Sequence, residues 1–165
     1  MYGEEPGLFA EWPLTPINWI GSLFSQQPNK NSTAIRYSWF VKALSISLAE
    51  RGANLHLKSV VKNIDSGIID FHGAGYLATG KMKFDDIIDF RDNDSNEIWY
   101  GGVMISKPNI EIFGIRPDQT IEVWSKKEIE GNFIQKMEWR GIDPQYALID
   151  RINRGIDVAE SIIFE

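Results

Sequence analysis

The sequence predicts an α/β or α+β fold, in which a mostly antiparallel mixed sheet accompanies a mid-chain helix and a long C-terminal helix. Apolar residues recur at helical spacing in residues 37–52 and again in residues 143–165. Between these segments, short apolar runs alternate with turn-forming residues, which is typical of antiparallel strands. A chain of 165 residues has the size of one ordinary domain, so a single domain over residues 1–165 is expected.

The first 35 residues are predicted to form an irregular arm that packs on a body of residues 36–165. Proline at high density interrupts regular structure, and aromatic side chains favour burial. The arm contains Pro6, Pro13, Pro16, Pro28, Trp12, Trp19 and Phe24. One short helical turn is expected near residues 17–24. Most of the six tryptophans of the chain are expected in the core.

The mid-chain helix is predicted to begin at Tyr37. Its apolar stripe consists of Tyr37, Val41, Leu44 and Leu48. Gly52 stands where a residue in the left-handed conformation would end the helix. The alternation of residues that follows predicts a strand over residues 55–62, half covered by that helix.

Further strands are predicted wherever an apolar run lies between turn-forming residues. These runs are residues 68–71, 84–90, 98–105, 110–115 and 120–124, with a tight turn at residues 116–119. The C-terminal helix follows Asp143-Pro144, because an acidic cap with proline in the first turn is typical of a helix start. Its apolar stripe, over about five turns, comprises Ile149, Ile152, Ile156, Ala159 and Ile163.

The composition limits the classes of function. With 17 basic and 23 acidic residues, the net charge is -6, which repels the phosphates of nucleic acids, so no nucleic-acid partner is expected. The chain has no cysteine, which fits a reducing compartment. Its apolar runs are far shorter than the roughly 18 residues of a membrane span, and its first residues are acidic rather than basic. A cytoplasmic protein without a membrane span is therefore expected.

Two glycine-rich motifs are similar in spacing to a nucleotide site and to a catalytic site. Residues 75–82 have the spacing of a phosphate-binding loop, but Met82 stands where a hydroxyl would hold magnesium. That motif also needs a helix next, whereas residues 81–90 are predicted as a strand, so a hairpin turn is the favoured interpretation. Residues 72–75 resemble an oxyanion loop, yet the sequence has no Gly-x-Ser-x-Gly elbow, and its other histidine, His56, falls in a predicted strand. No catalytic residue is assigned.

Acidic residues cluster twice without completing a metal or acid–base site. Residues 92–96 begin like a calcium loop, but Glu97 replaces the glycine of its sharp turn, and Val103 stands where the closing carboxylate belongs. A second group in a predicted strand favours solubility of an edge strand over acid–base chemistry. Its members are Asp85, Asp86 and Asp89. No metal ligand is assigned.

Residues 37–65 and 83–89 together resemble the central region of FAD-dependent oxidoreductases with the glutathione-reductase-like two-domain fold. In that family a helix that ends in glycine leads to a strand whose valine contacts the adenine of FAD, which implies that role for Val61. A later strand of the family, with an acidic residue and two aliphatic residues, resembles residues 86–88. The C-terminal helix is similar to the closing helix of the family, whose amino end faces the flavin. The resemblance thus implies a flavin-side position for Asp143.

The chain departs from this family at the glycines that bind the dinucleotide. No Gly-x-Gly-x-x-Gly follows an N-terminal strand, and Phe90-Arg91 replace a glycine that the family usually has. The resemblance therefore implies an incomplete or split part of a flavoenzyme. Three alternatives follow: the chain is a C-terminal fragment, a separate chain supplies the N-terminal half, or the cofactor site of the family has been lost.

Two functions from different classes agree with the sequence. One is the flavoenzyme part, with FAD as its cofactor. The alternative is a non-catalytic binding or assembly domain, whose aromatic arm and sheet hold a protein or a small hydrophobic ligand. A third interpretation, a phosphate-loop enzyme, requires residues 81–90 to be helical. A further copy of this chain is also considered as a partner.

Overall fold

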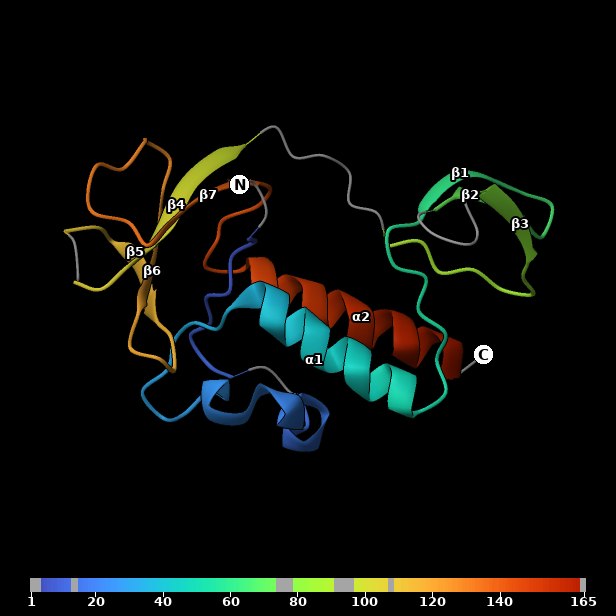
Figure 1. Ribbon diagram of the computed structural model, residues 1–165, viewed down its shortest axis with the longest axis horizontal. Coiled ribbons are helices and arrows are strands. Elements are labelled where there is room, and N and C mark those ends of the chain that lie inside the picture. Colours follow the sequence, from blue (N-terminus) through green and yellow to red (C-terminus); the bar gives the residue numbers. More distant parts are fainter. Residues whose placement is uncertain (1–3, 13–14, 74–78, 91–96, 107–108, 164–165) are drawn as a thin grey trace. The chain divides into compact units, whose positions relative to one another are not determined.

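The structure is a computed structural model that describes residues 4–12, 15–73, 79–90, 97–106 and 109–163 (Figure 1). The fold is α+β, with two antiparallel sheets, helices near the N-terminus and a long C-terminal helix, as the sequence predicts. The chain divides into two compact units, one of Met1–Ser47 with Asp94–Glu165 and the other of Leu48–Asn93. The single domain expected over residues 1–165 stays a prediction.

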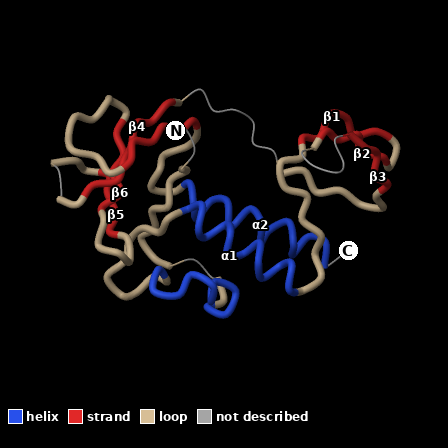
Figure 2. Tube along the Cα trace, in the orientation of Figure 1, coloured by secondary structure: helices blue, strands red, loops and turns tan. Residues whose placement is uncertain are grey.

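The sheet of the first unit has four antiparallel strands in the order β5-β6-β4-β7. Figure 2 draws the strands of the chain in red and labels β4, β5 and β6 of this sheet. They are β4 (Ile98–Met104), β5 (Ile112–Ile115), β6 (Ile121–Ser125) and β7 (Gln135–Arg140). The first three confirm the strands predicted at residues 98–105, 110–115 and 120–124. The predicted turn between β5 and β6 is also confirmed, because the Gln119 amide donates to the Arg116 carbonyl at 2.9 Å.

Strand β7 is not among the predicted strands. Only Met137 and Trp139 alternate as apolar residues in its sequence, which is too short a pattern to separate from a loop. The strand forms because it pairs with β4 over its whole length, for example Gly101 with Met137. Gly101 has a packing role as well, since a Cβ atom there would lie 2.4 Å from the Trp124 ring. Trp124 is fully buried against this backbone.

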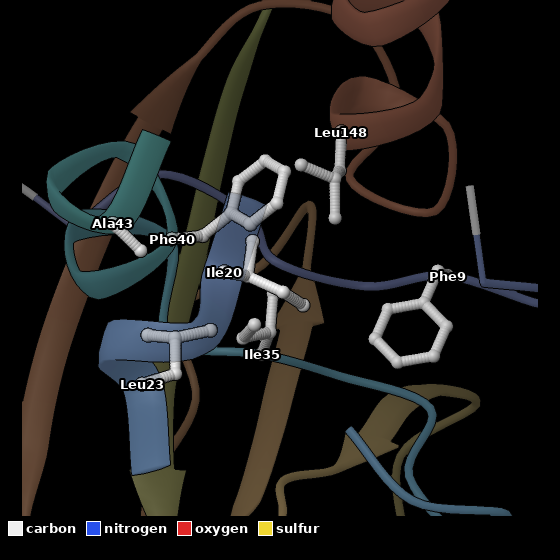
Figure 3. Packing of buried hydrophobic residues seen from close by; sticks show 7 residues of the cluster. All are labelled: Phe9, Ile20, Leu23, Ile35, Phe40, Ala43 and Leu148. Atoms are coloured by element: carbon white, nitrogen blue, oxygen red, sulfur yellow. The ribbon is translucent and has the colours of Figure 1, made fainter. Parts of the chain in front are cut away.

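The first unit also contains a kinked 3-10 helix, η1 (Ile17–Gln26), the helix α2 (Ala147–Ile163) and most of the helix α1 (Tyr37–Glu50), whose last three residues belong to the second unit. Residues of the arm, α1 and α2 form one core cluster, shown in Figure 3. Its members are Phe9, Ile20, Leu23, Ile35, Phe40, Ala43 and Leu148. The arm is thus held on the body by apolar packing, and the Ala34 amide donates to the carbonyl of Ile115 at 3.0 Å. A β-bridge between Leu8 and Ala34 joins the two ends of the arm itself.

Helix α1 ends as predicted, but its buried face is different. Gly52 has φ +95°, and the amide of Ala53 donates to the carbonyl of Leu48 at 3.1 Å, which is the bond pattern of a Schellman cap. Of the predicted stripe, Tyr37 and Leu44 are half-buried and pack against the core cluster. The prediction is wrong for Val41 and Leu48, because both side chains are exposed. The buried residues of the helix are Phe40, Ala43 and Ser47. Apolar residues lie on nearly every side of α1, so periodicity alone did not fix the side that meets the core.

Helix α2 is joined to α1 and the arm by Arg151. Its Nη1 atom donates to the Tyr37 hydroxyl at 2.8 Å and pairs with the carboxylate of Glu5. The guanidinium also lies 4.9 Å from the centre of the Trp139 ring, so it stacks on β7. Along the predicted apolar stripe of α2, Ile149, Ile152 and Ile156 are half-buried and Ala159 is exposed, so the stripe is covered mainly in the first half of the helix.

The second unit contains a three-stranded antiparallel sheet in the order β1-β2-β3. Its strands are β1 (Val60–Asp65), β2 (Ile68–His72) and β3 (Thr79–Lys83). Strand β2 confirms the strand predicted at residues 68–71, whereas β1 begins later than residue 55. Lys58 explains the late start, because its φ of +56° is incompatible with an extended strand.

The strand predicted at residues 84–90 is wrong. The amide of Phe84 donates to the carbonyl of Gly67 at 3.0 Å, just before the first residue of β2, and this bond closes the ladder between β2 and β3. Beyond this bond β2 offers no further residue to pair with, because it begins at Ile68. The apolar residues that follow, among them Ile87, Ile88 and Phe90, therefore lie in an irregular and exposed segment.

Candidate functional site

Val61, the predicted adenine-side residue, lies on β1 and is half-buried. It pairs with Phe71 of β2, and Ile64 pairs with Ile69 of the same strand. A bulge between Val61 and Asn63 lets Val61 and Ile64 share one face of the sheet despite their odd spacing. That face is apolar, whereas the opposite face carries polar residues such as Asp70 and Lys81, which form an ion pair at 3.3 Å.

Asp143, the predicted flavin-side residue, lies in the first unit at the entry to α2. One of its carboxylate oxygens accepts a hydrogen bond from the Gln145 amide at 2.9 Å, and its carbonyl accepts one from the Tyr146 amide at 3.0 Å. Asp143 therefore acts as the helix-start residue that the sequence predicts. Val61 and Asp143 belong to different compact units, so no shared site follows from the structure.

The described residues do not fit FAD by themselves. A dinucleotide places its pyrophosphate at the amino end of a helix, where free backbone amides receive it. At the amino end of α1 that place is taken by Glu4, whose carboxylate accepts from the Ser38 amide at 3.1 Å and from the Ser38 hydroxyl at 2.6 Å. At the entry to α2 the Gln145 amide is bound by Asp143.

The electrostatics of Glu4 agree with an ionised carboxylate at the amino end of α1. The carboxylate is almost fully buried, and burial alone would raise its pKa. The hydrogen bonds from Ser38 and the charges of Arg116 and Arg36 outweigh this, so the pKa of Glu4 is lowered from its usual value of 4.5. Gln135 of β7 donates to the same carboxylate at 3.3 Å.

The remaining sequence motifs form no catalytic or metal site in the described residues. Lys81 lies in β3, so the helix that a phosphate-binding loop requires is a strand here. His72 ends β2, and His56 lies 6.5 Å from the Phe71 ring. The calcium-like loop at residues 92–96 lies outside the described part of the chain. Within that part, no three histidine or acidic side chains are placed to hold a metal ion.

A buried ion pair between Arg116 and Glu122 was not predicted. Glu122 is fully buried and accepts from the guanidinium of Arg116 at 2.6 and 3.0 Å. It also accepts from the Gly7 amide and from the Trp124 indole, both at 2.8 Å. The sequence signal was an acidic residue inside the apolar run of β6, with a basic residue across the tight turn. The pair fixes the arm to the sheet and is fully satisfied, so it serves the fold.

An apolar groove lies on the surface between η1 and α1, and it is the strongest candidate for a binding site. Its volume is about 310 Å³. The apolar walls are formed by Leu23, Phe24, Trp39, Ala43 and Ile46, and the polar lining residues are Ser22 and Lys42. Trp39 and Ile46 are 41% and 38% exposed, so large apolar side chains line an open surface instead of the core.

Phe24 forms the edge of this groove in a strained conformation. Its φ is +50° and its ψ is -123°, a region that bulky residues rarely adopt and that costs about 1–3 kcal/mol. Gln27 stabilises the kink, since its amide donates to the Phe24 carbonyl at 3.2 Å. The ring nevertheless remains 80% exposed. The strained backbone thus accompanies an aromatic ring at the edge of the groove. Packing in the core does not explain this conformation, because the side chain is exposed.

Arg36 and Lys42 bring positive charge to the α1 side of the groove. The Arg36 guanidinium lies 5.1 Å from the centre of the Trp39 ring and also pairs with Glu4 at 3.3 Å. Lys42 lines the groove directly, and among the described residues no ion pair with Lys42 is formed. The sequence signal for this site was the apolar character of α1 outside the predicted stripe, at Trp39 and Ile46.

No protein-family model, curated protein or solved structure matches this chain. The family resemblance therefore depends on the sequence pattern alone. In the described part of the chain, no helix is long and apolar enough to cross a bilayer.

Proposed function

We propose that the chain is a non-catalytic binding domain that holds an apolar ligand in the groove between η1 and α1. The observation that carries this proposal is the exposed ring of Phe24, held at positive φ beside Trp39 and Ile46. Exposed apolar patches lined by aromatic residues are typical of binding surfaces, and backbone strain concentrates at functional sites. We place this activity in the cytoplasm, in agreement with the cysteine-free sequence.

The test uses two apolar residues of α1 that are equally exposed. Ile46 lines the groove, whereas Val41 is 40% exposed on the same helix and does not line it. We expect the neutral dye Nile red to bind the wild-type chain and the Val41→Asp variant, with binding lost in Ile46→Asp. Equal binding by all three proteins, with unchanged circular dichroism, would contradict the proposal.

A second candidate function is the later part of a flavoenzyme whose dinucleotide-binding half is supplied by another chain. The observation that favours it is the passage from α1 through Gly52 to β1, with Val61 on the apolar face of the small sheet. Any FAD site of this kind needs amides from the second chain, because Glu4 occupies the amino end of α1. Flavin chemistry would then belong to the assembled complex.

This candidate is tested by absorbance of the purified chain and by titration with FAD, followed by flavin fluorescence. Val61→Asp is compared with Val60→Asp, since Val60 pairs with His72 on the opposite face and is 54% exposed. Quenching that only Val61→Asp removes would support the flavin candidate. A colourless chain that does not quench FAD is not a self-sufficient flavoprotein, and the binding domain is then favoured.

A further inference from the structure

The charge pattern of the groove identifies the kind of apolar ligand that it fits. Lys42 is the one charged residue among the lining residues, and it lies between apolar walls on α1. The Lys42 ammonium has no described ion-pair partner, whereas the nearby Arg36 is paired with Glu4. Lys42 thus places a positive charge beside exposed aromatic rings, on a chain whose net charge is -6.

A lysine in this setting favours a carboxylate. The four-carbon stem can lie along an apolar wall while the ammonium stays at the rim, where it acts as a compact point charge. When an apolar ligand displaces water from the groove, the local dielectric falls and the attraction between ammonium and carboxylate increases. We propose that the ligand is a single-chain apolar carboxylic acid, with its chain against Trp39 and Ile46 and its carboxylate on Lys42.

The dimensions of the groove fit a small molecule of this kind. The lining residues of α1 run from Trp39 to Ile46, two helical turns or about 10 Å at 1.5 Å per residue. The volume of about 310 Å³ lies at the lower end of the range of about 300–1,000 Å³ for small-molecule sites. An extended helix or a dinucleotide would exceed this length, whereas a medium-length acyl chain would not.

This inference rests on the proposed binding function, and the experiment separates the two. Binding of decanoate, decanol and decylammonium is measured by displacement of Nile red, with each ligand below the concentration at which it forms micelles. We expect decanoate to bind about twofold to fivefold more tightly than decanol, as one partly exposed ion pair provides. Added salt is expected to reduce this difference without weakening decanol binding.

Variants of Lys42 assign the difference to one side chain. Lys42→Gln is expected to bind decanoate and decanol equally, and Lys42→Glu to bind decylammonium more tightly than decanoate. Lys127→Gln, which removes an exposed lysine outside the groove, is the matched control and is expected to keep the wild-type preference.

The possible outcomes differ in what they overturn. Equal binding of decanoate and decanol by the wild-type chain would overturn the carboxylate inference and leave the binding function in place. A decanoate preference that survives in Lys42→Gln would overturn the assignment to Lys42. Displacement of Nile red by none of the three ligands would overturn the inference, and the proposed function would fall with it if Ile46→Asp also bound the dye normally.

Discussion

In the first sheet, the carboxylate of Glu122 is the centre of a cluster of buried hydrogen bonds. Its carboxylate binds Arg116, the Gly7 amide and the Trp124 indole in a place that water does not reach. A buried pair of charges adds little stability as a pair, because desolvation offsets the attraction. Removal of one partner is costly, however, since the other charge is left buried without compensation.

We therefore expect Glu122→Gln to lower the free energy of unfolding by about 3–5 kcal/mol, measured by urea denaturation at neutral pH. The control is Glu138→Gln, whose exposed pair with Arg140 at 3.3 Å should contribute less than about 1 kcal/mol. A loss in Glu122→Gln no larger than that of the control would show that the buried pair is not needed for stability.

Glu4 is expected to make the stability of the chain dependent on pH. Its pKa in the folded chain is below the usual value of 4.5, so its ionised form stabilises the fold above that value. This stability is lost as the pH falls through the lowered pKa of the folded state. The difference in free energy of unfolding between the wild type and Glu4→Gln should therefore be largest at neutral pH and shrink below pH 4.5.

Chemical denaturation over a pH series measures this difference, with Glu11→Gln as the control because Glu11 is exposed on the same arm. A difference that stays constant from neutral to acidic pH would contradict the assigned role of Glu4.

At the scale of elements, the two helices each have a glycine whose substitution should change stability, one at the C-terminal cap of α1 and one inside α2. Gly52 ends α1 with φ +95°, a conformation in which an alanine is strained. Gly155 lies inside α2, and a Cβ atom added there would have no neighbouring atom within 4 Å. Gly52→Ala is expected to lower the free energy of unfolding by about 1 kcal/mol. Gly155→Ala is expected to raise it by about 0.5–1 kcal/mol.

The expected decrease in stability for Gly52→Ala and the expected increase for Gly155→Ala are measured from the thermal midpoints of the two variants. Loss of stability in both variants would mean that α2 needs its glycine for a contact, and gain in both would mean that α1 does not end in the left-handed cap.

At the scale of the whole molecule, the two compact units differ in how much they bury. All described core clusters belong to the first unit. The described residues of the second unit include no fully buried side chain, although its sheet has one apolar face. Local opening requires less free energy where fewer apolar contacts must break.

Hydrogen exchange followed by mass spectrometry should therefore show amides of β1, β2 and β3 exchanging about tenfold faster or more than those of β4 and β6. Exchange at the same rate in both sheets would show instead that the two units open together, as one cooperative domain.

Features that depend only on neighbouring residues could be predicted from the sequence. The end of α1 at Gly52, the turn that Gln119 closes and the helix start at Asp143 follow from backbone preferences and side chains a few positions away. The strands β4, β5 and β6 followed from apolar runs between turns, because burial on the sheet selects such residues.

Features that depend on residues far apart in the sequence could not be predicted, because they form only when the chain has folded. The buried face of α1 is the face that packs against the arm and Leu148. Strand β7 forms because it pairs with β4. Strand β3 ends where β2 has no further residue to pair with. Glu122 meets Gly7 across 115 positions of sequence, so no local pattern could identify that contact. The groove depends in the same way on the fold, because it exists only where η1 and α1 come together and leave Trp39 uncovered.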